Sequence, residues 1–277
     1  MGSPLRAAIR LVMFLGWTVL LLPLQALAVV FDRKAARRIP VFYHRNCCRL
    51  LGFRVATRGT ISPARPTLFV CNHSSYLDIT ILGSLVEGSF VSKAEVARWP
   101  LFGTLARLQR TVFIDRRSTQ AANHADEIGT RLAAGDNLFL FPEGTSSDGN
   151  RVLPFRSALF SVAQHEVDGA PLAVQPVSIA YTRLDGIPLG RALRPLYTWF
   201  GDMDLGAHMW TMLGLGRLTV EVQFHEPVTF AQFGSRKALA AHTYGAVANG
   251  LAALNAGVAP ITKRRRRLRR RPAAERA

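Results

Sequence analysis

An uncharged apolar run near the N-terminus most constrains how this chain can fold. Residues 11–30 carry no charged side chain and are rich in leucine and valine. As an α-helix rising 1.5 Å per residue, about twenty such residues match the hydrocarbon thickness of a bilayer. A basic cluster follows directly: Arg33, Lys34, Arg37 and Arg38. Such a cluster favours retention of the next segment on the cytoplasmic side, so the run predicts a transmembrane helix that anchors the chain.

A cleaved signal peptide is the alternative interpretation of this run. Arg6 and Arg10 resemble the basic start of such a peptide, and residues 26–28 (Ala-Leu-Ala) resemble its cleavage site. The basic cluster after the run favours the anchor instead. Residues 33–52 then predict an amphipathic helix at the membrane interface. The apolar residues available to one side of it are Ile39, Val41, Phe42 and Leu50.

The charge and the cysteines narrow the possible partners and the compartment. The formal net charge is +17, and removing the eight positive charges of residues 263–271 still leaves +9. Residues 258–277 therefore predict a basic, disordered tail that could hold anionic lipid head groups or nucleic acid. The three cysteines, Cys47, Cys48 and Cys71, offer neither a disulfide framework nor a Cys-x-x-Cys metal pattern. They predict structural thiols in a reducing compartment.

From about residue 53 short apolar strands alternate with helical segments. The predicted strands are 53–57, 67–71, 90–92, 111–114, 137–141, 172–180 and 218–224, and the predicted helices are 74–86, 100–108, 118–134, 157–167 and 235–256. This alternation predicts an α/β fold with a mixed, largely parallel sheet flanked by helices. Three parts follow: an N-terminal helical segment (1–52), an α/β domain (53–257) and the tail (258–277). Residues 183–216 are expected to be irregular, with their apolar and aromatic residues partly buried or in contact with the membrane.

A histidine and an aspartate follow the predicted strand 67–71 at a spacing of five residues. On one continuous helix, His73 and Asp78 would point apart. They can meet if His73 lies in the loop that leaves the strand and Asp78 lies in the first turn of the next helix. Ser74 and Ser75 are good N-caps for that helix. A histidine held by a carboxylate is suited to general-base catalysis.

Three further clusters lie where α/β enzymes keep functional groups, at the ends of strands. Asp115, Arg116 and Arg117 follow the predicted strand 111–114, and such guanidinium groups suit phosphate or carboxylate. Residues 142–149 place a carboxylate, glycines and several hydroxyls in one turn. Pro176 lies inside the predicted strand 172–180, which predicts a sheet edge or a bulge.

Taken together and in order, these patterns resemble the lysophosphatidic acid acyltransferase family of glycerolipid acyltransferases. The segments that carry the resemblance are 72–78 (Asn-His-Ser-Ser-Tyr-Leu-Asp), 113–116 (Phe-Ile-Asp-Arg), 141–145 (Phe-Pro-Glu-Gly-Thr) and 174–177 (Val-Gln-Pro-Val). By this resemblance His73 is the general base and Asp78 orients it, without a covalent acyl-enzyme. The resemblance also implies the substrate-binding residues Asn72, Lys93, Arg116, Glu143, Gly144, Thr145 and Ser146. It implies no metal and no nicotinamide or flavin cofactor, with acyl-coenzyme A or acyl carrier protein as the acyl donor.

One departure from the family pattern concerns the acceptor. The family commonly has an arginine directly after the threonine of the third segment, where this chain has Ser146. The string 141–151 resembles the subgroup that acylates lyso-ornithine lipid in bacteria, so this lipid and 1-acylglycerol-3-phosphate both stay open as acceptors. The resemblance places the enzyme at the bacterial inner membrane, with its catalytic domain in the cytoplasm.

Two other function classes are compatible with parts of the sequence. The basic tail could belong to a protein that binds anionic membranes or nucleic acid, although its positive run has no interleaved aromatic residues. A lipid hydrolase could use one of the serines near the predicted site, but the sequence has no Gly-x-Ser-x-Gly nucleophile elbow. The lipid acyltransferase accounts for more of the sequence than either alternative.

Overall fold

The computed structural model describes residues 2–114, 128–167 and 169–258. The α-helices are α1 (Pro4–Phe31), α2 (Arg33–Leu50), α3 (Leu77–Gly83), α4 (Phe102–Leu108), α6 (Leu205–Gly214) and α7 (Arg236–Asn255). Short 3-10 helices are η1 (Ala94–Arg98), η2 (Ser157–Gln164), η3 (Arg194–Leu196) and η4 (Phe230–Gln232). Residues 128–133 are also helical. The predicted helix 118–134 therefore lies partly outside the described residues, as do Arg116 and most of the basic tail.

The strands form one large sheet and one small hairpin. The strands of the large sheet are β1 (Phe53–Arg58), β2 (Thr67–Cys71), β3 (Ser89–Lys93), β4 (Val112–Ile114), β5 (Leu138–Leu140), β8 (Ala173–Leu184), β9 (Ile187–Pro188), β10 (Leu218–Phe224) and β11 (Val228–Thr229). β6 (Glu166–Val167) and β7 (Ala170–Pro171) pair with each other. The main order is β1-β10-β8-β2-β5-β3-β4, and its pairs are parallel except β10–β8. The predicted mixed, largely parallel sheet is confirmed.

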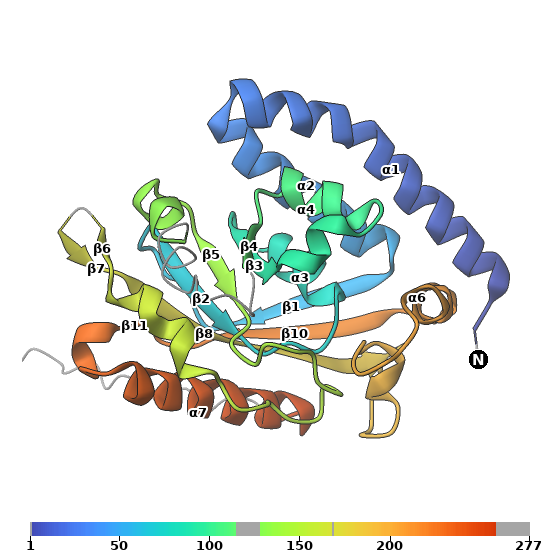
Figure 1. Ribbon diagram of the computed structural model, residues 1–277. Helices are drawn as coiled ribbons and strands as arrows, with labels where there is room; N and C mark the ends of the chain where they lie inside the picture. Colours follow the sequence, from blue (N-terminus) through green and yellow to red (C-terminus); the bar gives the residue numbers. More distant parts are fainter. Residues whose placement is uncertain (1, 115–127, 168, 259–277) are drawn as a thin grey trace, which may run out of the picture.

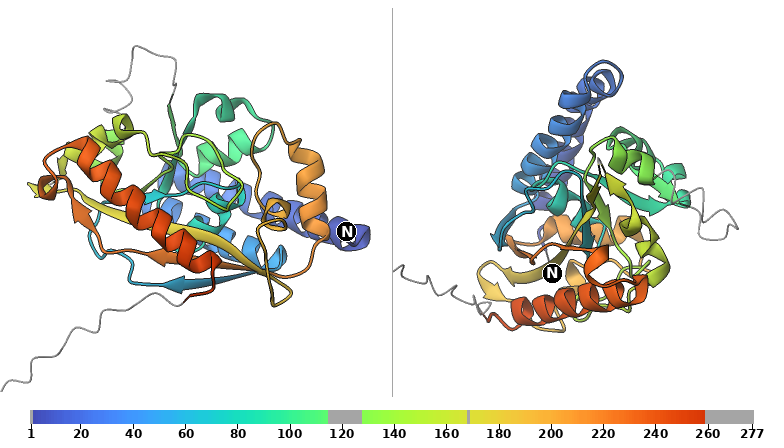
Figure 2. Two further views of the ribbon diagram at one scale, coloured as in Figure 1. Left: turned by 90° about the horizontal axis from the view of Figure 1, so that it is seen from below. Right: turned by 90° about the vertical axis from the view of Figure 1, so that its left-hand side faces the viewer.

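Helices cover both faces of this sheet (Figure 1). α1 to α4 lie on one face and α7 on the other, as Figure 2 also shows. Side chains alternate between the two faces along each strand. Phe69 of β2 packs in the core beneath α3, whereas Leu68 and Val70 pack in the core beneath α7. The central strands are thus buried on both sides, which explains why β2 has no polar alternation in its sequence.

At Pro176 the predicted sheet edge is wrong, whereas the predicted irregularity in strand pairing is present: between the pairs Phe224–Val177 and Val228–Val174, three residues (225–227) stand against two of β8. Pro176 lies in β8, which pairs with β2 on one side and with β10 and β11 on the other. Pairing with β10 ends at Val177, and pairing with β11 begins at Val174. Pro176 therefore faces the gap between two partner strands, where its missing N–H costs no ladder hydrogen bond. Its carbonyl accepts a hydrogen bond from the His225 backbone N–H at 3.0 Å.

Two helix predictions also need correction. The segment 183–216 is not irregular throughout, because it contains α6. Asp204 caps this helix by accepting a hydrogen bond from the Ala207 N–H at 2.7 Å. The predicted helix 157–167 is a 3-10 helix that ends at Gln164, and β6 follows it. The three cysteines are buried, free thiols.

Candidate active site

His73 and Asp78 meet where β2 leaves the sheet. β2 ends at Cys71, His73 lies in the following loop, and Asp78 lies in the first turn of α3. His73 Nδ1 donates a hydrogen bond to Asp78 Oδ2 at 2.9 Å. The predicted loop-and-helix arrangement is therefore confirmed as geometry. The imidazole stacks on the ring of Phe141 with 4.3 Å between centroids. Because Nδ1 is bound to Asp78, Nε2 is the nitrogen available to a substrate.

The Asp78 carboxylate is fully buried and accepts hydrogen bonds on both oxygens. Besides His73, Oδ2 accepts from the backbone N–H groups of Ser74 at 2.7 Å and Ser75 at 3.0 Å. Oδ1 accepts from the hydroxyl of Tyr181 at 2.6 Å. Capping of α3 by the serine hydroxyls was therefore a wrong prediction. The carboxylate of Asp78 binds the free N–H groups of the loop instead, and the same carboxylate holds His73.

The carboxylate of Glu143 holds the backbone of the His73 loop. Glu143 Oε1 accepts from the His73 N–H at 2.6 Å, and Oε2 accepts from the Leu153 N–H at 2.7 Å. The His73 carbonyl in turn accepts from the Ser147 N–H at 2.9 Å. Burial raises the pKa of Glu143 to about 8, against the two backbone donors, which lower it. Each carboxylate oxygen of Glu143 thus accepts from one backbone N–H, and the predicted contact of Glu143 with substrate stays a prediction.

Asn72 is likewise bound to backbone. It is fully buried, and its side-chain amide makes two hydrogen bonds to Ile179 of β8. Asn72 Nδ2 donates to the Ile179 carbonyl at 3.0 Å, and the Ile179 N–H donates to Asn72 Oδ1 at 2.8 Å. These contacts fasten the start of the His73 loop to the neighbouring strand. They give Asn72 a structural role, and its predicted contact with substrate stays a prediction.

The other predicted residues lie at the same edge of the sheet. β2, β5 and β3 are parallel neighbours, so their carboxyl ends meet. Gly144 is buried in the turn after β5 with φ +74°, a conformation that favours glycine. Thr145 is exposed in that turn and Ser146 is partly exposed. Lys93 ends β3 and is partly exposed. Arg116, predicted beside them, lies outside the described residues.

A largely apolar cavity of about 250 Å³ opens beside His73. Its wall includes His73, Leu21, Trp99, Trp199, Met209 and Met212. These side chains come from α1, α6 and the loops around the sheet, so segments far apart in the sequence build one chamber. The sequence indicated the apolar and aromatic residues of 183–216 as partly buried or membrane-contacting, but it did not show that they line a cavity with the histidine. Within the described ranges, no group of three His, Cys, Asp or Glu side chains lies close enough to hold a metal ion. The expected absence of a metal stays a prediction.

Comparison with known proteins identifies the family. The sequence model of the family described as Acyltransferase matches residues 52–180. The lyso-ornithine lipid O-acyltransferase of Brucella abortus is 47% identical over 224 residues, which cover 79% of this chain and 84% of that protein. The chain belongs to this acyltransferase family. The resemblance seen in the sequence segments is thereby confirmed, and the protein is an acyltransferase.

Other members of the family show how far the likeness extends. The lyso-ornithine lipid O-acyltransferase of Rhizobium meliloti is 42% identical and covers 79% of this chain and 77% of its own length. The 1-acyl-sn-glycerol-3-phosphate acyltransferase of Neisseria gonorrhoeae is 33% identical, covering 60% of this chain and 62% of its own length. The crystal structure of the 1-acyl-sn-glycerophosphate acyltransferase of Thermotoga maritima superposes with a TM-score of 0.62 at 23% identity, covering 91% of this chain and 97% of that one. That structure shares the acyltransferase fold.

Proposed function

We propose that this protein is a membrane-bound O-acyltransferase of lipid biosynthesis. It moves a fatty acyl group from an acyl thioester to the free hydroxyl of a lyso-lipid. The observation that carries the proposal is the contact between His73 and the buried Asp78 beside a largely apolar cavity. The contact supplies a general base, and the cavity supplies a place for a hydrocarbon chain.

The reaction follows from the position of the imidazole. Nε2 of His73 takes the proton of the acceptor hydroxyl as its oxygen bonds to the thioester carbonyl carbon. The carbon–sulfur bond then breaks, and the thiolate leaves and takes the proton back from His73. Asp78 keeps the proton on Nδ1 and offsets the charge of the imidazolium. Such general-base help is worth roughly 10²- to 10⁴-fold in rate. The route needs no covalent acyl-enzyme, metal or redox cofactor.

For the acceptor we propose lyso-ornithine lipid. The two relatives with the higher identity act on this lipid according to their names. Ser146 supports the same choice, because it replaces the arginine that could bind a phosphate in the third segment. Lys93, Gly144, Thr145 and Ser146 are the described residues proposed to contact the head group. Arg116 is proposed to join them, and 1-acylglycerol-3-phosphate is the competing acceptor.

For the donor we propose acyl-coenzyme A or acyl carrier protein. Both are anionic, and the basic surface of this chain favours their encounter. The acyl chain of the donor is proposed to occupy the cavity beside His73. We propose three parts with the boundaries 1–52, 53–257 and 258–277. The residues proposed to carry out the transfer, His73 and Asp78, lie in the middle part.

We further propose that α1 holds the protein at the membrane by lying in one leaflet of the bilayer, in place of the transmembrane span expected from its sequence. α1 is long and apolar enough to cross a membrane. Its N-terminal end is tied to α6, where the Ser3 N–H donates to the Gly214 carbonyl at 3.0 Å. Near its other end, Gln25 Nε2 donates to the Leu108 carbonyl at 2.8 Å. Both ends thus contact the same domain, which favours a helix lying along the membrane with its exposed apolar face in the lipid. The proposed location is the cytoplasmic face of the bacterial inner membrane.

The test is an acyl-transfer assay with one labelled thioester donor and both lyso-lipids. We expect the wild-type protein to acylate lyso-ornithine lipid in preference, and His73→Ala to lose transfer by at least 10²-fold while staying folded. His242→Ala is the matched control, because His242 is exposed on α7 at the opposite face of the sheet. Near-normal transfer by His73→Ala would refute the proposed base.

The same assay separates the alternatives. Release of free fatty acid without any acylated lipid would identify a hydrolase. An acyl group trapped on a serine would overturn direct transfer without a covalent acyl-enzyme. Equal transfer to both lyso-lipids, or preference for 1-acylglycerol-3-phosphate, would overturn the acceptor assignment. Deletion of residues 259–277 tests the tail: loss of nucleic-acid binding with unchanged transfer would show a separate binding role.

A further inference from the structure

Tyr181 contacts the proposed dyad from a distant part of the chain. It lies on β8, 103 residues after Asp78, and its ring is buried in the core between the sheet and α3. Its hydroxyl donates to Asp78 Oδ1 at 2.6 Å. Burial, and then the neighbouring Asp78, raises the pKa of the Tyr181 hydroxyl well above its ordinary value. The phenol therefore keeps its proton and remains a donor.

The two oxygens of Asp78 are held in different ways. Oδ2 accepts from His73 Nδ1 and from the N–H groups of Ser74 and Ser75. Within the described part of the chain, Tyr181 is the one donor that reaches Oδ1. A carboxylate fixed through one oxygen can rotate about that oxygen, whereas donors on both oxygens fix its plane. Because Asp78 is fully buried, solvent cannot readily replace a missing donor.

The position of Tyr181 is set by the register of β8 on β2. Cys71 pairs with Val177, and Asn72 binds both backbone groups of Ile179. Val177, Ile179 and Tyr181 alternate along the strand, so they share the face toward α3. The contacts that hold the start of the His73 loop therefore also bring the Tyr181 hydroxyl to Asp78.

We propose that Tyr181 is a positioning residue for acyl transfer: it orients the Asp78 carboxylate, which in turn orients the His73 imidazole. The inference rests on the proposed role of His73 and Asp78 in the reaction. Without the hydroxyl, Oδ1 becomes a buried acceptor with no donor among the described residues, and the carboxylate turns. This change weakens the hold on Nδ1–H and misdirects Nε2 from the acceptor hydroxyl. Substrate binding is not altered, because the hydroxyl of Tyr181 is bound to Asp78 in the core.

The experiment compares Tyr181→Phe with Tyr197→Phe. The two rings stack with 6.4 Å between centroids, and both are buried. The Tyr197 hydroxyl is hydrogen-bonded to no residue within the described ranges, so its removal deletes the same atom without touching Asp78. We expect Tyr181→Phe to lower kcat by roughly tenfold or more, as loss of a hydrogen bond to a charged group would. The KM values of donor and acceptor should change less than about twofold. Tyr197→Phe should leave kcat near the wild-type value.

The outcomes separate this inference from the proposed function. Activity retained by His73→Ala would refute the base itself. Loss of activity in His73→Ala, together with equal kcat values for the two tyrosine variants, would refute the role of Tyr181. A rise in KM without a fall in kcat would also refute it. If Tyr181→Phe does not fold, 3-fluorotyrosine at position 181 replaces it, because its more acidic hydroxyl changes the donor but little of the shape. 3-Fluorotyrosine should change kcat when it replaces Tyr181 and leave kcat unchanged when it replaces Tyr197. Equal effects at both positions would refute the inference.

Discussion

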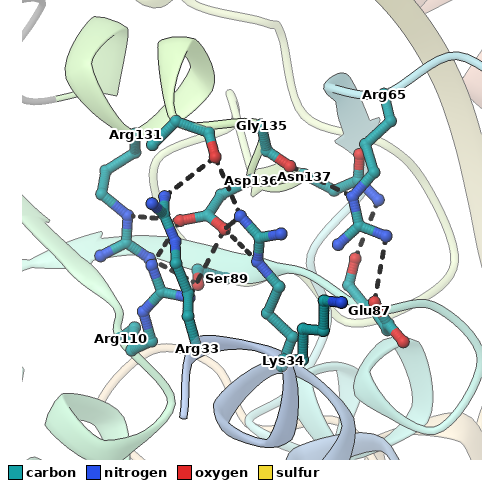
Figure 3. Close-up of polar contacts among 12 residues, drawn as sticks. Arg33, Lys34, Arg65, Glu87, Ser89, Arg110, Arg131, Gly135, Asp136 and Asn137 are labelled. Atoms are coloured by element: carbon teal, nitrogen blue, oxygen red, sulfur yellow. Dashed lines mark hydrogen bonds and ion pairs between the residues drawn. The ribbon is translucent and has the colours of Figure 1, made fainter. Parts of the chain in front are cut away.

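Removing the carboxylate of Asp136 should destabilise the protein more than removing the exposed carboxylate of Glu87. Asp136 is almost fully buried and pairs with three guanidinium groups, from Arg37 of α2 at 2.6 Å, Arg110 at 2.5 Å and Arg131 at 3.0 Å. Figure 3 shows Arg110 and Arg131 beside Asp136. These arginine side chains are 17 to 22% exposed. Burial alone would raise the pKa of Asp136, but the three arginines outweigh it and hold the pKa below its ordinary value.

The magnitude follows from the arginines that would remain. Leaving buried charge without its partner costs about 3–5 kcal/mol, and the partial exposure of the arginines reduces this. Asp136→Asn keeps one acceptor oxygen, so we expect a loss of about 2–4 kcal/mol in the free energy of unfolding. Denaturant unfolding in detergent measures it. Because the pKa of Asp136 is lower in the folded protein than in the unfolded chain, its carboxylate stabilises the fold at pH values above the unfolded pKa, and this stabilisation is lost as the pH falls. The wild-type protein and Asp136→Asn should therefore converge in stability as the pH falls below about 4.

Glu87→Gln is the matched control in the same network. Glu87 is 31% exposed and pairs with the exposed Arg65 at 3.0 Å, so its loss should cost less than about 1 kcal/mol. Arg37 lies on α2, and its ion pair with Asp136 holds this helix against the domain. We therefore also expect faster hydrogen exchange in residues 33–40 of Asp136→Asn, but not in those of Glu87→Gln. Equal unfolding free energies for the two variants would refute the reasoning, because the contribution of an ion pair to stability would then not depend on its burial.

Two further predictions concern the His73 loop and the far side of the sheet. In Glu143→Gln, one acceptor oxygen becomes an NH₂ group, so the side chain can no longer accept from both the His73 N–H and the Leu153 N–H. We expect kcat to fall while KM changes little in steady-state assays. A rise in the KM of the acceptor alone would instead indicate that Glu143 binds the acceptor directly. Burial lowers the pKa of His225 to about 4, below its unfolded value of about 6.5, so its contribution to stability is present above pH 6.5 and is lost as the pH falls toward 4. His225 by itself contributes at most about 1.4 kcal/mol per pH unit to this slope. Burial also lowers the pKa of His44 to about 4, so His225→Gln should reduce the slope of the unfolding curves without abolishing it; an unchanged slope would contradict the assignment to His225.

The features that could be predicted from the sequence depend on residues close together in the chain. Strands 67–71 and 218–224 were predicted at their observed bounds, because the first is a continuous apolar run after Thr67 and the second has strand-forming residues at alternate positions. The contact between His73 and Asp78 followed from a loop and one helical turn. The helix α6 was missed because its residues are apolar all round and show no helical period. The available signal was Asp204, a good N-cap directly before it.

The contacts that could not be predicted depend on the order of strands in the sheet. Tyr181 meets Asp78 because β8 pairs with β2, and Arg37 meets Asp136 because α2 packs near the start of β5. Such pairs lie about a hundred residues apart, and no local pattern marks them. The place of Pro176 inside the sheet, and not at its edge, could not be predicted for the same reason. A proline in a strand needs a place where no N–H is required, and here two partner strands leave that place inside the sheet.

The polar residues of the family segments therefore fall into two groups: some bind the backbone of the protein, and others keep surface that a substrate could contact. The sequence did not reveal this difference. Asn72 and Glu143 look like ligand-binding side chains, yet each is buried and makes two hydrogen bonds to backbone. A buried amide or carboxylate with its hydrogen bonds made has little left to offer a substrate. Thr145 and Ser146 keep exposed surface in the same turn. Selection between lyso-lipids should thus respond to changes at Ser146, whereas changes at Asn72 or Glu143 should lower the rate with either acceptor. A variant of Glu143 that switched acceptor preference would show that this division is wrong.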